Sequence, residues 1–454
     1  MIPKYLLLGL FALLFLTSSD PYFSGDLFKD KMPSTDEANV REMTWMSSEA
    51  FRPYLEDHDN RVSEAFKISP YYYASVNFWF MIYTQFESSS VVIHDKSNLG
   101  LIYKVLDFSS LHKKKLPRNT LYILQRELAD EKLESLKGEL AELIRDPFSL
   151  TPSAKRIYQT LSYAKVDLPL KKEDRVAFFK SLKKNIRTQT GQKNFIREGV
   201  VRSLPYRPFL EKYFSSRKLP LELIAIPFLE SSFNPRAHSK VNALGVWQFM
   251  PLIASYFVPK RTNHYDYRSN VGVASVAAGF LMSENFQIMK SWDLAVTAYN
   301  SGTKHLLKTK RELASNDVDL EAIIKHSDSE HFGFASKNFY SEFLALAHTL
   351  AYREELFDQL HEHDRQDVNQ DLKFYLAKCP LKLSKVLDER LLDDVKFHNH
   401  QLSAKLSQIP KGFILTSKST LPAGRFLEVP FEKLVKVRPR DWSDLLKRQS
   451  CSTR

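Results

Sequence analysis

Hydrophobic positions recur at helical spacing through much of the chain. In residues 119–145 leucines return at intervals that place them on one face of a helix. The stripe comprises Leu121, Leu124, Leu128, Leu133, Leu136, Leu140 and Leu143. We interpret it as a face packed into a core and not as a cofactor-binding segment. Pro147 and Pro152 end this unit, because proline cannot donate the hydrogen bond that a helix interior requires.

The same periodicity continues into the centre of the chain. It predicts helices over residues 155–164, 173–187, 198–214, 221–230, 273–281, 292–299 and 339–352. Strand signals are scarce in this part of the chain. We therefore predict that the centre of the protein is mainly α.

The pattern differs on both sides of this helical centre. In residues 71–107 aromatic and β-branched residues dominate and alternate with polar ones, which predicts short strands or a hairpin. Residues 20–70 are polar and mixed, and we expect a poorly ordered lead to which we assign no fold. After Arg365 the composition shifts again, and a compact pattern covers residues 372–426.

The first 19 residues have the layout of a secretory signal peptide. Lys4 is followed by an apolar run over residues 5–16 and then by small polar residues. The run is too short to span a bilayer comfortably, and the alternative is an uncleaved amphiphilic anchor. No cysteine follows it, which argues against lipidation. We expect an exported protein of the periplasm or cell envelope, or a secreted one, with peripheral association with the membrane or the cell wall.

Length and charge narrow the classes of function. The 454 residues suggest two or three folding units, and 43% hydrophobic with 26% charged residues indicate a globular protein. The net charge of +12 favours polyanionic partners, such as nucleic acid or cell-wall glycan that carries peptide carboxylates. The basic clusters lack the aromatic residues of an RNA-binding surface, so we interpret them as solvated faces and expect no nucleic-acid partner.

No metal or organic cofactor is expected from the sequence. Cys379 and Cys451 are the only cysteines, and they could pair or stay free but cannot build a Cys-based zinc site. Only 13 glycines disfavour phosphate-cradling loops. His361 and His363 flank Glu362 at a spacing unlike that of a zinc-binding helix.

Two further histidine motifs are weak evidence for a metal or catalytic site. His398, Asn399 and His400 spell a nuclease-like triplet, but no metal-binding context surrounds them. His94 and Asp95 lie in the segment that predicts strands, and we expect a structural hydrogen bond there.

Glu230 is the most distinctive carboxylate of the chain. It ends a strongly apolar predicted helix and is flanked by Phe228, Leu229 and Phe233. Apolar neighbours should raise the pKa of this carboxyl group, and a neutral carboxylic acid is what general-acid cleavage of a glycosidic bond requires. The alternative interpretation is a glutamate at a helix end that faces water.

Polar residues typical of sugar sites follow Glu230 along the chain. Hydroxyl and amide groups recognise sugar hydroxyls and acetamides, and this sequence offers Ser239, Gln248, Tyr299 and Asn300. Trp247 or Phe249 could stack on a pyranose face.

These segments together resemble the catalytic domain of soluble lytic transglycosylases, in the branch of membrane-bound lytic murein transglycosylase D. Glu230 and Ser231 resemble the catalytic Glu-Ser pair of the family. The other matching positions are Ala237, Ser239, Ala243, residues 245–248, Tyr265, Asp266, Arg268 and residues 298–302. Four separated motifs in the right order make a chance agreement improbable. The family usually has glycine where this chain has Asn242, which tolerates a positive φ better than other non-glycine residues.

The resemblance covers most of residues 75–360 and implies a fold. We expect a mainly α protein, with a lysozyme-like helical catalytic domain of the goose-lysozyme type over residues 191–360. A mixed and then helical accessory region over residues 71–190 would precede it. Residues 370–430 loosely resemble a degenerate LysM-like sugar-binding module of α+β structure, with a plain helical cap as the alternative. Residues 431–454 form a basic tail.

The resemblance also implies a reaction. The bond between N-acetylmuramic acid and N-acetylglucosamine in peptidoglycan would be cleaved without water, and Glu230 would act first as acid and then as base to give 1,6-anhydromuramoyl products. Ser231, Ser239, Gln248, Tyr299 and Asn300 would contact the substrate. The alternatives are a hydrolase like goose-type lysozyme and a non-catalytic peptidoglycan-binding protein. We expect a monomer.

A second catalytic carboxylate is not required by this mechanism. Ordinary glycosidases use two carboxyl groups roughly 5–10 Å apart. The candidates near Glu230 in sequence are Asp266, Glu284 and Asp293. We interpret Asp266 with Arg268 as a structural ion pair and Asp293 as a surface residue near a helix start.

Overall fold

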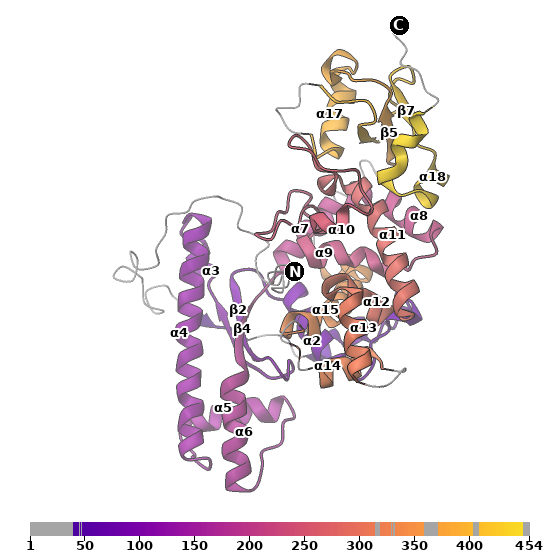
Figure 1. Cartoon of the computed structure of the whole chain (residues 1–454). Coiled ribbons are helices and arrows are strands. Elements are labelled where there is room, and N and C mark those ends of the chain that lie inside the picture. The colour runs from indigo at the N-terminus through magenta and orange to yellow at the C-terminus, as the bar shows by residue number, and fades with distance from the viewer. Residues whose placement is uncertain are drawn as a thin grey trace. The chain divides into compact units, whose positions relative to one another are not determined.

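The computed structural model describes residues 40–44, 46, 48–313, 318–327, 329, 332–357, 371–402 and 408–447 (Figure 1). This part of the chain divides into two compact units. We call residues 40–61 and 67–196 the sheet unit, and residues 62–66 and 197–447 the helical unit. The predicted signal peptide, His361, His363 and Cys451 lie outside the described residues.

The sheet unit is built around a four-stranded antiparallel sheet with the order β1-β3-β2-β4. Its strands are β1 (Arg41–Glu42), β2 (Ser90–Asp95), β3 (Ile102–Asp107) and β4 (Ile186–Thr190). The hairpin expected in residues 71–107 is formed by β2 and β3, in which Val92 pairs with Val105. The helix predicted over residues 173–187 extends two residues too far, because residues 186 and 187 belong to β4.

The strand prediction is wrong for the first part of that segment. Helix α2 (Tyr73–Thr84) occupies it, and every residue from Val76 to Thr84 is buried. A helix buried all round carries no polar face, so its apolar run has no period that would distinguish it from a strand. Its length of 12 residues is what favours a helix.

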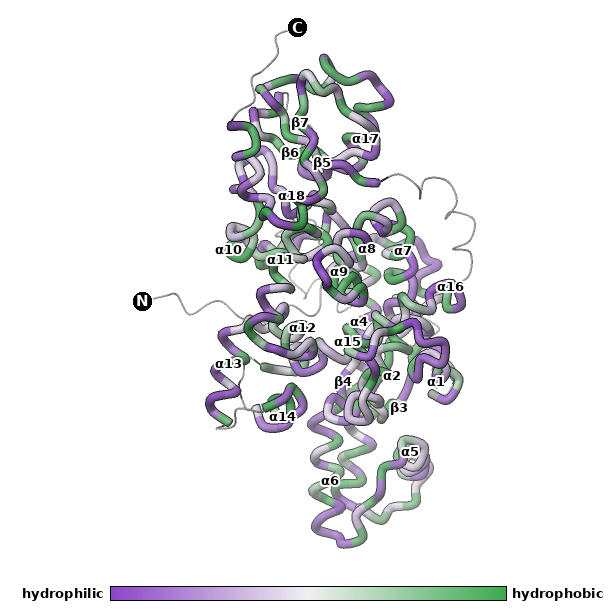
Figure 2. Tube along the Cα trace, turned by 90° about the vertical axis from the view of Figure 1, so that its right-hand side faces the viewer, coloured by the Kyte–Doolittle hydropathy of each residue, from purple (hydrophilic) through white to green (hydrophobic). Residues whose placement is uncertain are grey.

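One short helix and three longer ones form most of the rest of the sheet unit. They are α3 (Ser109–His112), α4 (Arg118–Arg145), α5 (Pro152–Tyr163) and α6 (Lys172–Asn185). The leucine stripe of α4 is confirmed as core, because Leu128, Leu136, Leu140 and Leu143 are buried in one cluster with residues of β2 and β3. Figure 2 shows the alternation of hydrophilic and hydrophobic positions along α6, which contacts α4. Pro152 opens α5 rather than ending a helix, since proline suits the first helical turn.

Short helices replace the expected unfolded lead where the structure describes it. They are η2 (Ser48–Phe51), α1 (Arg52–Leu55) and η3 (Glu64–Phe66). The prediction of a poorly ordered segment is therefore wrong for residues 48–66. Phe51, Leu55 and Phe66 are buried at 4%, 2% and 0% exposure, and this burial offsets the entropy cost of ordering a polar segment.

The helical unit confirms the mainly α prediction. Its elements are α7 (Lys193–Ser203), η4 (Leu204–Tyr206), α8 (Arg207–Ser216), η5 (Leu221–Ala225), α9 (Ile226–Ser231), α10 (Pro251–Ala254), η6 (Tyr267–Ser269), α11 (Val271–Met289), α12 (Trp292–Ser301), α13 (Thr303–Glu312), α14 (Leu320–His326), α15 (Phe334–Ala351) and α16 (Arg353–Leu356). Helix α11 contacts α12, α12 contacts α15, and α15 contacts α9 (Figure 1). Among the described helices, none is both long and apolar enough to cross a bilayer.

The end of the helical unit is a small α+β module, as predicted. We call residues 371–402 and 408–447 the C-terminal module. It contains β5 (Lys373–Ala377), η7 (Leu383–Lys385), α17 (Glu389–His398), β6 (Ile414–Ser417), β7 (Phe426–Glu428), α18 (Phe431–Lys436) and η8 (Pro439–Leu446). Its antiparallel sheet has the order β6-β5-β7, so the alternative of a plain helical cap is wrong. The described part of the basic tail is folded, since Leu434 and Trp442 are buried.

Candidate functional site

Glu230 lies in the last turn of α9, where the chain turns sharply. The helix ends at Ser231 and is capped by Ser232, whose φ is 48°, and Phe233 follows with a φ of 57°. Two consecutive non-glycine residues in the left-handed region store strain, which tertiary contacts must offset. Glu230 is half-buried at this turn, and the rest of α9 is in the core.

The environment of Glu230 favours a neutral carboxyl group. Burial raises the pKa of Glu230 from 4.5 to about 8. Within the described part of the chain, no side chain forms an ion pair or a hydrogen bond with this carboxyl group that could hold it charged. The desolvation expected from the apolar neighbours is therefore confirmed, and the group can hold a proton at neutral pH.

Ser231 is turned inward and fixes the strained turn. Its side chain is fully buried, and its single hydroxyl proton is shared between the main-chain oxygens of Pro227 and Val246, at 3.1 and 2.9 Å from the Ser231 oxygen. The same oxygen accepts from the amide of Asn234 at 3.0 Å. These contacts connect α9 to the loop that follows it, and they leave Ser231 no free face for a substrate.

Residues 237–249 form a compact loop beside α9, which we call the catalytic loop. The hydroxyl of Ser239 accepts from the amide of Ala243 at 2.9 Å, so this side chain closes a turn. Asn242 has a φ of 69° within that turn, as expected where the family has glycine. Single bridges join Leu244 to His238 and to Phe249, which closes the loop on itself.

The side-chain amide of Gln248 is fixed by hydrogen bonds from its nitrogen, while its oxygen has no partner among the described residues. Its Nε2 donates to the main-chain oxygens of Ala237 and Gly245 at 3.1 and 2.8 Å. Because a carbonyl oxygen can only accept, these two bonds fix which end of the amide is the nitrogen. The Oε1 atom has no partner among the described residues and is available to accept a hydrogen bond.

The two aromatic residues expected to stack on sugar are not available for it. Trp247 and Phe249 are 0% and 2% exposed. The Trp247 ring stacks on Phe214 at a centroid distance of 6.0 Å, and its Nε1 donates to the Ser275 hydroxyl at 2.9 Å. The stacking prediction is therefore wrong. Both rings are packed in the core, where they anchor the catalytic loop.

Helix α12 brings Tyr299 to Glu230. The Tyr299 hydroxyl donates to the main-chain oxygen of Trp247 at 2.5 Å. Burial raises the pKa of Tyr299 well above its usual value, and the neighbouring Glu230 carboxylate raises it further. The next residue, Asn300, is half-buried and accepts through Oδ1 from the hydroxyl of Ser336 at 3.0 Å.

Arg268 clamps the catalytic loop from the other side. It is 2% exposed and forms a two-pronged ion pair with Asp266, in which Nη2 lies 2.8 Å from Oδ2, so the predicted structural pair is confirmed. Its Nη1 donates to the main-chain oxygens of Asn242 and Phe249 at 2.6 and 2.8 Å. A Cβ atom at Gly245 would lie 1.9 Å from the Arg268 main-chain oxygen, so the close approach requires glycine.

The other candidate carboxylates are used elsewhere. Glu284 forms an ion pair with Arg438 of the C-terminal module. Asp293 lies in the first turn of α12, near a helix start as predicted. Burial is the cause of the raised pKa of Glu230, and no second carboxylate contributes to it.

The described motifs at His94 and His398 contribute to the fold. The ring of His94 is buried, its Nδ1 lies 3.0 Å from the main-chain oxygen of Asp95, and burial lowers its pKa to about 3. The structural hydrogen bond predicted for this pair is confirmed. His398 is buried in α17, with Nε2 3.4 Å from Asp394.

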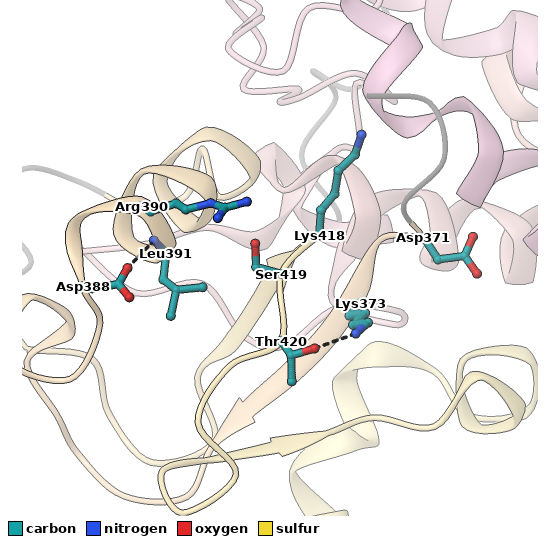
Figure 3. A pocket seen from close by; sticks show the side chains of 8 residues that line it. All are labelled: Asp371, Lys373, Asp388, Arg390, Leu391, Lys418, Ser419 and Thr420. Atoms are coloured by element: carbon teal, nitrogen blue, oxygen red, sulfur yellow. Dashed lines mark hydrogen bonds between the residues drawn. The ribbon is translucent and has the colours of Figure 1, made fainter. Parts of the chain in front are cut away.

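A polar cleft of about 500 Å³ lies in the C-terminal module and does not include Glu230 (Figure 3). Charged and hydroxyl side chains line it, and several of them already have partners. Lys373 donates to the Thr420 hydroxyl at 2.8 Å, Asp388 caps α17 through the amide of Leu391, and Asp371 pairs with Lys212. The cleft therefore adds nothing to the chemistry of Glu230.

Comparison with known proteins identifies the part of the chain that holds this site. Residues 210–320, which include Glu230, the catalytic loop and Tyr299, match the transglycosylase SLT domain. Over 118 residues the chain is 36% identical to "Membrane-bound lytic murein transglycosylase D" of Escherichia coli strain K12, which covers 26% of this chain and 26% of that protein. Over 108 residues it is 34% identical to a "Putative tributyltin chloride resistance protein" of Alteromonas sp. strain M-1, covering 24% of this chain and 52% of that protein. The matches thus span about a quarter and about half of the relatives' lengths.

Proposed function

We propose that this protein, whose residues 210–320 form a transglycosylase SLT domain, is a lytic transglycosylase that cleaves the glycan strands of peptidoglycan. One observation carries the proposal. The carboxyl group of Glu230 is desolvated at the end of an apolar helix, and its pKa is raised to about 8. A protonated carboxyl group at neutral pH is the general acid that a glycosidic bond requires.

Glu230 serves both halves of the proposed reaction. It protonates the oxygen of the β-1,4 bond between N-acetylmuramic acid and N-acetylglucosamine, and the glucosamine leaves as an alcohol. The resulting Glu230 carboxylate takes the proton of the C6 hydroxyl, whose oxygen bonds to C1 of the muramoyl sugar. The product is a 1,6-anhydro ring, no water is consumed, and Glu230 ends protonated as it began.

Among the described residues, no second carboxylate contributes to the raised pKa of Glu230, which supports this route over hydrolysis. Hydrolysing glycosidases place two carboxyl groups roughly 5–10 Å apart to activate water or to form a covalent intermediate. Among the described residues, Asp266 and Glu284 have cationic partners instead. Hydrolysis like that of goose-type lysozyme remains the second candidate, and a non-catalytic peptidoglycan-binding protein is the third.

The site residues divide into substrate contacts and positioning residues. For contacts we propose Gln248, whose Oε1 can accept from a sugar acetamide or hydroxyl, together with Tyr299 and Asn300. For Ser231 and Ser239 we now propose positioning roles in place of substrate contacts, because their hydroxyls hold the turn after α9 and the catalytic loop.

The location follows from the substrate. Peptidoglycan lies in the cell envelope, and the first 19 residues have the layout of an export signal. We propose a monomeric, periplasmic or envelope-associated enzyme whose partners are the glycan strands.

Product analysis tests the proposal. Purified peptidoglycan is digested with the native protein or with Glu230→Gln, and the soluble products are identified by mass. We expect anhydromuramoyl products from the native protein alone. Hydrated muramic acid ends would indicate a hydrolase, and glycan binding without products would leave a binding protein.

A further inference from the structure

The C-terminal module shares its core with the helices around Glu230. A Cβ atom at Gly272 of α11 would lie 2.9 Å from side-chain atoms of Leu372 and Phe374, so α11 and β5 are in direct contact. Phe374 and Trp442 of the module are buried at 1% and 0% exposure and meet edge to face at 5.5 Å. Contacts of this closeness are those of one folded unit and not of a separately tethered domain.

A buried polar cluster joins the module to the start of α11. The Nδ2 atom of Asn270 donates to Oδ1 of Asn399 at 3.0 Å, and it lies 3.1 Å from both Gln401 Oε1 and Thr416 Oγ1. Its Oδ1 caps α11 through the amide of Val273 at 2.9 Å. These four side chains, Asn270, Asn399, Gln401 and Thr416, are at most 4% exposed, and we call them the amide cluster.

The amide cluster lies in sequence beside the arginine that clamps the catalytic loop. Asn270 follows η6, which carries Tyr267 and Arg268. The Tyr267 hydroxyl accepts from the amide of Ile414 in β6 at 2.9 Å, and its ring lies 5.5 Å from that of Phe413. One short segment therefore contacts the module through Tyr267 and Asn270 and the catalytic loop through Arg268.

The contacts continue from Arg268 to Glu230. Arg268 donates to the main-chain oxygens of Asn242 and Phe249 in the catalytic loop. The main-chain oxygen of Val246, in the same loop, accepts from Ser231, the neighbour of Glu230. The bonds from Arg268 to Phe249 and from Ser231 to Val246 are buried, and the bond from Arg268 to Asn242 is partly buried. Because an unmade buried hydrogen bond is costly, a shift of η6 would be transmitted to the loop.

We infer that the C-terminal module is a positioning element of the catalytic site, and that Asn399 and Thr416 set the geometry of Glu230 through Asn270 and Arg268. This inference rests on the proposed function for its activity readout. It also explains the His398-Asn399-His400 triplet, whose central residue donates from Nδ2 to the main-chain oxygens of Val395 and Thr416 and thereby joins α17 to β6.

The test compares three variants of the full-length protein. Thr416→Val keeps the side-chain shape but removes the hydroxyl that faces Asn270, and Asn399→Ala removes the centre of the amide cluster. Lys396→Ala is the matched control, because this exposed residue lies on the same helix α17. Each variant is measured for release of anhydromuramoyl products, for binding to insoluble peptidoglycan, and for hydrogen exchange of the amides in residues 237–249.

We expect Thr416→Val and Asn399→Ala to lower kcat by about 10- to 100-fold, since small misplacements remote from the chemistry have effects of this size. Peptidoglycan binding should remain, and amides of the catalytic loop should exchange faster than in the native protein. Lys396→Ala should match the native protein in all three measurements.

Native kcat together with native exchange of residues 237–249 in Thr416→Val and Asn399→Ala would overturn the inference. If Asn399→Ala does not fold, Thr416→Val decides alone. If the native protein releases no anhydromuramoyl products, the proposed function fails, but the exchange measurement still decides whether the module positions the loop.

Discussion

The Tyr299 hydroxyl donates a hydrogen bond to the main-chain oxygen of Trp247, which ties α12 to the catalytic loop next to Glu230. Tyr299→Phe removes this bond and keeps the ring. We expect kcat to fall by about 10- to 100-fold through misplacement of the loop and loss of the proposed contact of Tyr299 with the sugar, with a loss of stability of only about 1 kcal/mol. The measurements are product release and urea unfolding.

Tyr256→Phe is the control for this change, because Tyr256 is 51% exposed. If Tyr299→Phe were as active as Tyr256→Phe, the Tyr299 hydroxyl would have no part in the site.

The raised pKa of Glu230 predicts how activity depends on pH. The acid must carry its proton to act, and with a pKa of about 8 it does so at and below neutral pH. We expect kcat/KM to decline as pH rises through about 8, because the deprotonated fraction of Glu230 then grows. Initial rates of product release across this range provide the measurement, with circular dichroism to show that the protein stays folded. A rate that stayed constant well above pH 8 would contradict the assignment of the acid.

The same group should lower stability as pH rises. Its pKa is about 4.5 in the unfolded chain and about 8 in the folded protein, so between these values the folded state binds more protons. The free energy of unfolding is therefore highest below pH 4.5, as far as this group is concerned, and declines up to about pH 8.

Glu230→Gln removes this ionisation while keeping the shape. We expect the variant to be more stable than the native protein by up to about 5 kcal/mol above pH 8, and nearly equal to it at low pH. Denaturant unfolding at several pH values measures the difference. A stability difference independent of pH would mean that the folded pKa of Glu230 is not raised.

Arg268 is predicted to be essential for stability. Arg268→Ala leaves Asp266 without its ion-pair partner and removes the bonds that Arg268 donates to the main-chain oxygens of Asn242 and Phe249. Loss of one member of a buried pair costs about 3–5 kcal/mol. Denaturant unfolding measures the effect, beside Arg261→Ala as a control at an exposed position. Equal stability of the two variants would mean that the clamp contributes nothing to folding.

Asn242 tests the backbone of the catalytic loop. Its φ of 69° suits glycine, the bond to Arg268 uses only its main-chain oxygen, and the side-chain bond to the His238 ring is exposed, so Asn242→Gly should be close to neutral. Asn242→Val should cost about 1–2 kcal/mol, because a β-branched residue is strained in the left-handed region. Thermal unfolding of both variants gives the comparison, and similar melting temperatures would show that the loop relaxes around this position.

The sequence was informative wherever a pattern is local. Leu128 and Leu140 were assigned to a core from helical spacing, and the raised pKa of Glu230 was expected from its apolar neighbours alone. The same local reasoning failed for α2, where a segment buried on all sides carries no period. It also failed for Trp247, which is buried in the core. Aromatic residues occur both in cores and in sugar-binding sites, so the residue type alone does not distinguish the two.

The sequence by itself predicted the mainly α fold and a desolvated Glu230, because helical periodicity and the apolar surroundings of a carboxyl group are properties of neighbouring residues. The role of Glu230 as the general acid is implied by the resemblance of its motifs to a known family and stays a prediction. Only the tertiary structure decided which polar side chains already have hydrogen-bond partners within the protein and which can bind a substrate. The family resemblance predicts Ser231 and Ser239 as substrate contacts, whereas in the structure their hydroxyls are used within the fold. Asn270 and Thr416 were not singled out, since their hydrogen bond joins positions 146 residues apart, and no local pattern encodes such a pairing.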